Sequence, residues 1–199
     1  MNFLAHLYLS PDDEDILLGN FIADAVKGKT FDNYKQGVKN GILLHRKIDK
    51  YTDNHPVFKK SSKRLNGKYR KYSGVIVDIF YDHFLAANWH NYSDVKIEEF
   101  VSKAYGILIK NILFLPKKSK RILPFMITQN WLVNYANFKG LQRVFNGMSR
   151  RTPFNSGMEN AVNDLKKDYD LYEKEFSEFF PEIIEFVKDY NDILSTFEV

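Results

Sequence analysis

The chain of 199 residues has an apolar share of 44% and a charged share of 27%, which are ordinary values for a soluble globular protein. Its length is most simply that of a single domain over residues 1–199, with two small domains as the alternative. Cysteine is absent, which excludes disulfides, thiolate metal sites and cysteine nucleophiles and leaves His, Asp and Glu as the side-chain metal ligands.

Hydrophobicity and charge indicate where the protein is expected to reside and what it could bind. No stretch approaches the run of about 18 apolar residues that a membrane span needs, so we expect a cytoplasmic protein without a membrane partner. Charge is uneven, because residues 159–199 carry 12 acids against 4 bases whereas residues 1–158 carry 13 acids against 25 bases. The basic part of the chain would attract a nucleic acid, an acidic protein or a phosphorylated substrate.

Apolar residues recur at helical spacing along the chain and predict an all-α fold. Ser10 is expected to cap the second helix, with Pro11 at its first position. Pro181 is expected to end one helix and to start the last one. We expect helices over residues 3–9, 10–26, 41–53, 59–71, 74–89, 93–115, 124–135, 138–149, 156–180 and 181–193.

The first two helices each carry one ionisable residue in apolar surroundings. His6 lies within the apolar face formed by residues 3, 4, 7 and 8, where a histidine is more often a hydrogen-bonded core residue than a ligand. Asp24 follows an apolar turn and shares a helical face with Asn20, so we expect its carboxylate to be buried. Because an unpaired buried carboxylate is costly, Asp24 is a candidate ligand.

A stripe of ionisable residues runs along the helix over 41–53. His45, Asp49 and Asp53 are spaced at i, i+4 and i+8, and Arg46 stands beside them. A histidine and an aspartate at i and i+4 can clamp a metal ion, and the planar guanidinium of Arg46 can grip phosphate oxygens. The alternative is a surface helix on which Arg46 pairs with Asp49 or Asp53.

The stretch over 74–90 is among the most apolar in the chain, yet it contains Asp78, Asp82 and His83. Its length favours a helix over a strand, which places the two aspartates about 5–6 Å apart on one face. They could share a cation, and His83 would add an imidazole ligand. The alternative is a buried aspartate pair tied to arginines, because isolated carboxylates in low dielectric need a partner.

Three early helices therefore carry ionisable residues in apolar surroundings, and their convergence would form a metal site. One divalent ion would offset the desolvation cost of several carboxylates at once. Oxygen and imidazole ligands suit Mn²⁺, Mg²⁺ or Fe²⁺, and such an ion supports hydrolysis by polarising a phosphoryl oxygen and lowering the pKa of bound water.

Several short motifs in order resemble the bacterial acyl carrier protein phosphodiesterases, and the similarity covers nearly the whole chain. The motifs are MNFLAHL at 1–7, GNFIAD at 19–24, HRKID at 45–49 followed by TD at 52–53, VD at 77–78 with YDHFL at 81–85, QNWLV at 129–133, and NGM at 146–148 ahead of Arg150 and Arg151.

The resemblance implies a helical, HD-domain-like bundle, because that family is counted as an unusual branch of the HD-domain phosphohydrolases. Its members cleave the phosphodiester between 4′-phosphopantetheine and a serine of holo acyl carrier protein, with Mn²⁺ as a favoured metal. The order Asp82-His83 differs from the His-Asp pair of ordinary HD enzymes, and His45 is followed by Arg46 instead of an aspartate.

A set of site residues follows from the motifs and the resemblance together. The predicted metal ligands are Asp24, His45, Asp78, Asp82 and His83, with Asp49 as an outer or additional ligand and His6 as a weaker candidate. The predicted catalytic residues are His45, Arg46, Asp49, His83 and His6. In the implied mechanism Arg46 stabilises the phosphoryl oxygens, a histidine protonates the departing serine oxygen, and Arg150 or Arg151 adds to the phosphate clamp.

Carrier proteins of this class are small and acidic, so basic stretches are expected to form the docking surface. One candidate consists of Lys59, Lys60, Lys63, Arg64, Lys68, Arg70 and Lys71, and the other of Lys117, Lys118, Lys120 and Arg121. Such a run is usually just a solvated helix face. An alternative function is an HD-like hydrolase of nucleotides or another small phosphodiester. A third possible function is that of a non-enzymatic module that binds RNA or an acidic protein. Nucleic acid is the least favoured of these partners.

Overall fold

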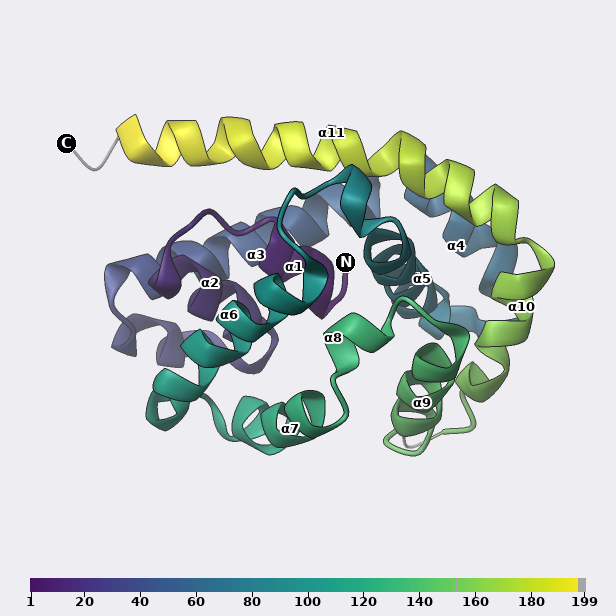
Figure 1. Cartoon of the computed structure of the whole chain (residues 1–199), viewed down its shortest axis with the longest axis horizontal. Helices are drawn as coiled ribbons and strands as arrows, with labels where there is room; N and C mark the ends of the chain where they lie inside the picture. Colours follow the sequence, from purple (N-terminus) through teal and green to yellow (C-terminus); the bar gives the residue numbers. More distant parts are fainter. Residues whose placement is uncertain (153, 197–199) are drawn as a thin grey trace.

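The computed structural model describes residues 1–152 and 154–196, with side chains described as far as residue 190. The described part contains helices and no strand, so the all-α prediction is confirmed (Figure 1). The α-helices are α1 (Phe3–Tyr8), α2 (Glu14–Ile22), α3 (Gln36–Asn54), α4 (Pro56–Tyr69), α5 (Ser73–Ala87), α6 (Ile97–Lys110), α7 (Lys117–Thr128), α8 (Trp131–Asn134), α9 (Phe138–Ser149), α10 (Ala161–Lys167) and α11 (Tyr169–Thr196).

Helix α5 forms the centre of the hydrophobic core. Ile76, Phe80 and Phe84 on this helix are fully buried, and α1, α4 and α11 pack around it. Helix α11 lies along one edge of the molecule and also contacts α3 (Figure 1). One continuous hydrophobic cluster joins residues from Met1 to Val187. Among the described residues, no helix combines the length and the apolar character needed to cross a membrane.

Helices α2 and α3 pack with their backbones in direct contact at two glycines. A Cβ atom added to Gly41 would lie 2.1 Å from the carbonyl oxygen of Ile16, and one added to Gly19 would lie 2.1 Å from that of Val38. Only glycine allows so close an approach. The contact brings α2 against the first two turns of α3 and places Asn20 beside His45.

The start of α2 differs from the prediction. Asp13 caps this helix, because its Oδ1 accepts hydrogen bonds from the backbone N–H groups of Asp15 and Ile16, both at 2.9 Å. Ser10 instead donates its hydroxyl to the carbonyl of His6 at 3.0 Å. A carboxylate at the positive end of the helix dipole provides the stronger cap. The end also differs, since α2 stops at Ile22 and a 3₁₀ turn, η1 (Ala23–Ala25), follows.

The prediction that Pro181 separates two helices is wrong, because α11 continues through it. A proline in a helix removes one hydrogen bond and costs about 3 kcal/mol. Phe179 and Phe180 before it and Ile183 and Val187 after it are all buried in the same core, which holds both halves in line. Residues 93–115 also form a shorter helix than expected, since α6 begins at Ile97 and ends at Lys110.

Candidate metal centre

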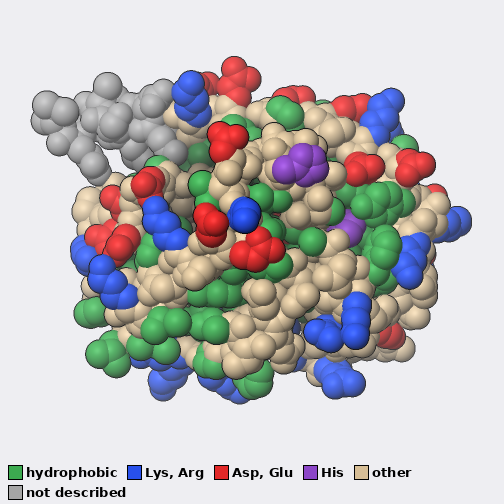
Figure 2. Space-filling view, in the orientation of Figure 1, with side chains coloured by type: hydrophobic (Ala, Val, Ile, Leu, Met, Phe, Trp, Pro, Cys, Tyr) green, Lys and Arg blue, Asp and Glu red, His purple; other side chains and the backbone are tan. Residues whose placement is uncertain are grey.

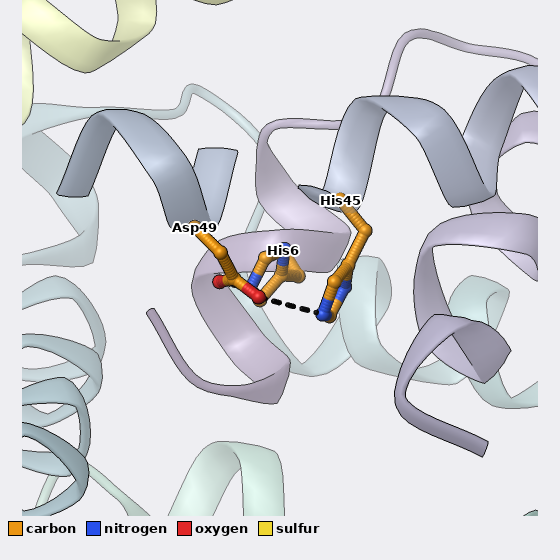
Figure 3. Close-up of side chains that lie close together, drawn as sticks. All are labelled: His6, His45 and Asp49. Carbon is orange, nitrogen blue, oxygen red and sulfur yellow. Dashed lines mark hydrogen bonds and ion pairs between the residues drawn. The ribbon is translucent and has the colours of Figure 1, made fainter. Parts of the chain in front are cut away.

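Three side chains from α1 and α3 form a compact cluster of possible metal ligands (Figure 3). The Nε2 atom of His6 lies 3.1 Å from Oδ1 of Asp49, and the Nε2 atom of His45 lies 3.1 Å from Oδ2 of the same residue. One ligand atom from each residue can be chosen so that all lie within 4.8 Å of one another. The i, i+4 spacing of His45 and Asp49 on α3 therefore positions both residues as predicted, and His6 completes the cluster.

Asp82 on α5 determines where His6 lies. Its Oδ2 accepts a hydrogen bond from the backbone N–H of Leu4 at 2.8 Å, and its Oδ1 accepts one from Ala5 at 3.2 Å. These groups are among the first N–H groups of α1, which lack partners within the helix. Burial raises the pKa of Asp82 to about 7, although the two amides favour its charged form. Asp82 thus anchors α1 with His6 directed toward α3.

Asn20 on α2 orients the ring of His45. The Nδ1–H of His45 donates to the backbone carbonyl of Asn20 at 2.9 Å and to its side-chain oxygen at 3.0 Å. Nε2 is left to face the carboxylates, with Asp24 Oδ1 at 3.5 Å in addition to Asp49. Metal-binding histidines commonly donate their second ring nitrogen to such an outer partner. Sequence analysis did not assign Asn20 this role, although a buried amide in an apolar helix is a signal for one.

The electrostatics of the cluster favour one bound positive charge. The rings of His6 and His45 stack with centroids 3.8 Å apart. Burial and the neighbouring His45 lower the pKa of His6 to about 4. Burial also opposes the charge on His45, but hydrogen bonds to Asp24 and Asp49 outweigh it and raise the pKa of His45 to about 9. Burial would raise the pKa of the Asp49 carboxyl, but hydrogen bonds from His45 and His6 hold it well below its usual range.

The residues present fit a divalent metal ion. Two imidazoles and a carboxylate suit a first-row ion, which would take the place of the proton on His45. In the described part of the chain the Nδ1 atom of His6 is buried without a hydrogen-bond partner, while Nε2 faces Oδ1 of Asp49 at 3.1 Å. A metal ion would take the place of the proton between His6 Nε2 and Asp49. The cluster is a possible metal-binding site.

Comparison with protein family models identifies the family of the chain. The family model described as acyl carrier protein phosphodiesterase matches residues 1–183. The chain belongs to that family. A relative with this name from Photorhabdus laumondii is 33% identical over 93% of this chain and 94% of its own length. Another relative with this name, from Enterobacter sp., is 32% identical over 92% of this chain and 96% of its own length. The predicted resemblance to the acyl carrier protein phosphodiesterase family is confirmed, while no solved structure matches the chain.

Two of the aspartates predicted as metal ligands, Asp24 and Asp78, lie outside the cluster of His6, His45 and Asp49. Asp24 lies in η1 and is 70% exposed, so the expectation that it is buried is wrong, because α2 ends before it reaches this position. Asp78 lies 2.8 Å through Oδ1 from the α-amino group of Met1, which is also 3.7 Å from Oδ1 of Asp49. Asp78 and Asp82 share a face of α5 as predicted, and both carboxylates face the start of α1.

The structure places His83 and Arg46 away from the cluster. The Nδ1–H of His83 donates to the carbonyl of Tyr135 at 2.8 Å, and Nε2 lies 3.1 Å from the hydroxyl of Tyr169. The guanidinium of Arg46 is exposed on α3 and lies 5.4 Å from the centroid of the Phe31 ring. The i, i+1 spacing of Asp82 and His83 turns the two side chains to different sides of α5, which explains why only one of them faces α1.

A cavity of about 400 Å³ opens beside the cluster, between α7 and α9 and against the starts of α1 and α5. Asp24 and Asp78 line it together with two cationic residues, Lys118 on α7 and Arg151 after α9. The Nε–H of Arg151 donates to the carbonyl of Gly147 at 2.9 Å, which fixes the side chain. Of Arg150 and Arg151, the two arginines predicted to contact phosphate, Arg151 is the one that lines this cavity.

Proposed function

We propose that this chain hydrolyses holo acyl carrier protein to apo acyl carrier protein and 4′-phosphopantetheine, with a divalent ion held by His6, His45 and Asp49. Water adds to phosphorus, the bond between phosphorus and the serine oxygen breaks, and that oxygen takes up a proton. The observation that carries the proposal is the cluster of two imidazoles and a carboxylate beside a cavity, in a member of this family. The HD-domain likeness of the fold stays a prediction.

The chain's own residues would have distinct tasks. Asn20 keeps Nε2 of His45 directed at the ion site, and Asp24 is near enough to serve as a further ligand. Arg151 would contact phosphoryl oxygens from the cavity wall, whereas Arg46 lies beside Phe31, does not border the cavity and is given no such role. When bound, the ion polarises a phosphoryl oxygen and acidifies water, with Mn²⁺ proposed and Mg²⁺ or Fe²⁺ as alternatives.

Removal of metal is expected to stop the reaction. After incubation with the protein and Mn²⁺, holo acyl carrier protein should lose the mass of 4′-phosphopantetheine, measured by intact-mass spectrometry, and a chelator should prevent the loss. A folded, Mn²⁺-loaded protein that leaves the carrier intact would contradict the proposal. A free nucleotide is the matched second substrate, because comparable turnover on it would favour a hydrolase of small phosphodiesters.

The predicted docking residues on α4 divide into two groups. Arg64 donates two hydrogen bonds, at 3.0 and 2.6 Å, to the buried carboxylate of Glu175 on α11, and Lys60 lies 3.4 Å from the same group. Lys68 pairs with Asp164 at 2.7 Å. These three cations are partly neutralised within the protein. The remaining predicted contacts are exposed, namely Lys59, Lys63, Arg70 and Lys71.

The second basic stretch, on the helix α7 that borders the cavity, combines cationic and apolar side chains on one exposed face. Lys117, Arg121 and Phe125 recur at four-residue steps along one exposed face of α7, and Phe125 is 58% exposed. Leu113 and Phe114 beside them are 82% and 69% exposed. Figure 2 shows hydrophobic side chains over this region and Lys and Arg side chains along the same edge. An acidic partner with apolar residues would complement this surface.

Charge reversal is expected to separate the two docking surfaces. We expect Lys117→Glu with Arg121→Glu to raise KM for the carrier about tenfold at low salt, because two rim pairs of up to ~1 kcal/mol each are replaced by repulsion. The matched pair Lys59→Glu with Lys63→Glu should have a smaller effect. KM measured at low and high ionic strength tests this, since salt should reduce the difference. Unchanged KM in both variants at low salt would exclude both surfaces.

A further inference from the structure

The cavity beside the metal centre is of a size to hold a small molecule. Its volume of about 400 Å³ lies within the range of roughly 300–1,000 Å³ typical of ligand pockets. Asp24 belongs both to the cavity wall and to the surroundings of His45, with its Oδ1 3.5 Å from Nε2 of that residue. One end of the cavity is therefore continuous with the proposed site of phosphorus chemistry.

The rest of the wall is mainly aromatic and aliphatic. Trp131 comes from α8 and Tyr135 directly follows that helix, Ile122 comes from α7, and Val144 and Met148 come from α9. The indole N–H of Trp131 is satisfied by the side-chain oxygen of Gln129 at 3.0 Å. The half-buried indole can therefore offer its ring to a ligand without leaving its N–H unpaired.

Polar groups are also present at the wall. The hydroxyl of Tyr135 accepts a hydrogen bond from the side-chain amide of Asn2 at 3.3 Å and still has its own proton to donate. The guanidinium carbon of Arg151 lies 6.0 Å from the centroid of the Trp131 ring, which places a cation beside the aromatic wall. An apolar wall with a few donors and an anion-binding group suits an extended, mostly neutral chain that carries one phosphate.

We propose that this cavity binds the 4′-phosphopantetheine half of the substrate diester, an inference that rests on the proposed function. The phosphoryl group lies at the end bordered by Asp24, where Lys118 and the proposed ion would supply positive charge, and the dimethyl and amide portion of the arm lies against Trp131 and Met148. The carrier protein stays outside, on the exposed face of α7. The product that keeps the phosphate is thus the half that the enzyme holds, and contacts to the arm provide specificity over other phosphodiesters.

Binding can be measured without turnover, because the chain has only two tryptophans. Trp89 is buried with its indole N–H bonded to the carbonyl of Val95 at 2.7 Å, and it does not line the cavity. In a Trp89→Phe protein, Trp131 is the single emitter. We expect 4′-phosphopantetheine, and more weakly pantetheine, to change its emission saturably. The Trp89→Phe protein should hydrolyse the carrier like the wild type.

Two cavity variants keep the test decisive. Trp131→Ala removes part of the wall and Met148→Phe fills part of the space, and each should weaken binding of 4′-phosphopantetheine in calorimetry at least about tenfold. Each should also raise KM for the carrier while the amount of bound Mn²⁺ stays the same. A wild-type protein that hydrolyses the carrier, combined with normal binding by both variants, would overturn the cavity assignment and leave the reaction standing. Saturable binding without any hydrolysis would support the cavity and overturn the proposed reaction.

Discussion

Replacement of Asp49 by asparagine is expected to abolish metal binding and to cut turnover of holo acyl carrier protein at least about a hundredfold. Asp49 is the residue shared by the cluster, since its two oxygens face His6 and His45 separately. Loss of an outer partner of a metal ligand typically costs roughly 10–100-fold in affinity or activity, so loss of a ligand should cost more. Elemental analysis of bound Mn²⁺ and intact-mass assay of the carrier measure the two effects.

His83→Gln is the matched control, because His83 is a predicted ligand that the structure surrounds with Tyr135 and Tyr169. We expect this variant to keep its Mn²⁺, since glutamine retains a donor and an acceptor for these two partners. Loss of Mn²⁺ in His83→Gln together with its retention in Asp49→Asn would place the ion elsewhere. It would then favour the ligand set of Asp24, His45, Asp78, Asp82 and His83.

Gly41→Ala is expected to lower the free energy of unfolding by about 3 kcal/mol, at the upper end of the typical cost of overpacking. The added Cβ would meet the carbonyl oxygen of Ile16 at 2.1 Å, so α2 and α3 would have to move apart. That movement separates Asn20 from His45, and Mn²⁺ affinity should fall about tenfold as well. Urea denaturation and metal titration provide the two measurements.

Gly106→Ala on α6 is the control for this helix contact. Among the described residues no heavy atom lies within 4 Å of a Cβ added at this exposed position, so the substitution should stabilise the protein by about 0.5–1 kcal/mol through helix propensity alone. Equal destabilisation by both variants would show that the close approach of α2 and α3 is not the cause. An unchanged Mn²⁺ affinity in a destabilised Gly41→Ala would separate stability from site geometry.

Most helices of the fold follow from the spacing of apolar residues. The helix around Phe80 was predicted almost to both ends and the helix around Ile42 almost to its C-terminal end, because periodicity acts locally, but the latter begins five residues earlier than predicted. The failure at Pro181 arose because distant contacts outweigh local preference. Pro181 remains inside α11 because apolar residues on both sides of it are buried in a core built from other helices.

The site was predictable in its residue types but not in its full geometry. The i, i+4 spacing of His45 and Asp49 fixes their common face within one helix, so this pair was found. Spacing gives no information on which faces of different helices meet. His6 was therefore ranked low although it lies in the cluster, and His83 was ranked high although its contacts lie on another side of α5.

The contact between Asp82 and the start of α1 has a consequence for the order of events in folding. It joins Asp82 to Leu4 and Ala5, which lie 78 and 77 positions away in the sequence. Such distant contacts must overcome the entropy of closing a long loop before they stabilise the fold. Pairing of α2 with α3 assembles Asn20 and His45 without α1. The carbonyl of His6 also accepts a hydrogen bond from the side-chain amide of Asn20 at 2.8 Å, so α1 can join this pair through a short-range contact, whereas its contact with α5 is long-range. We therefore expect the ligands to assemble early in refolding and their anchoring by Asp82 to follow.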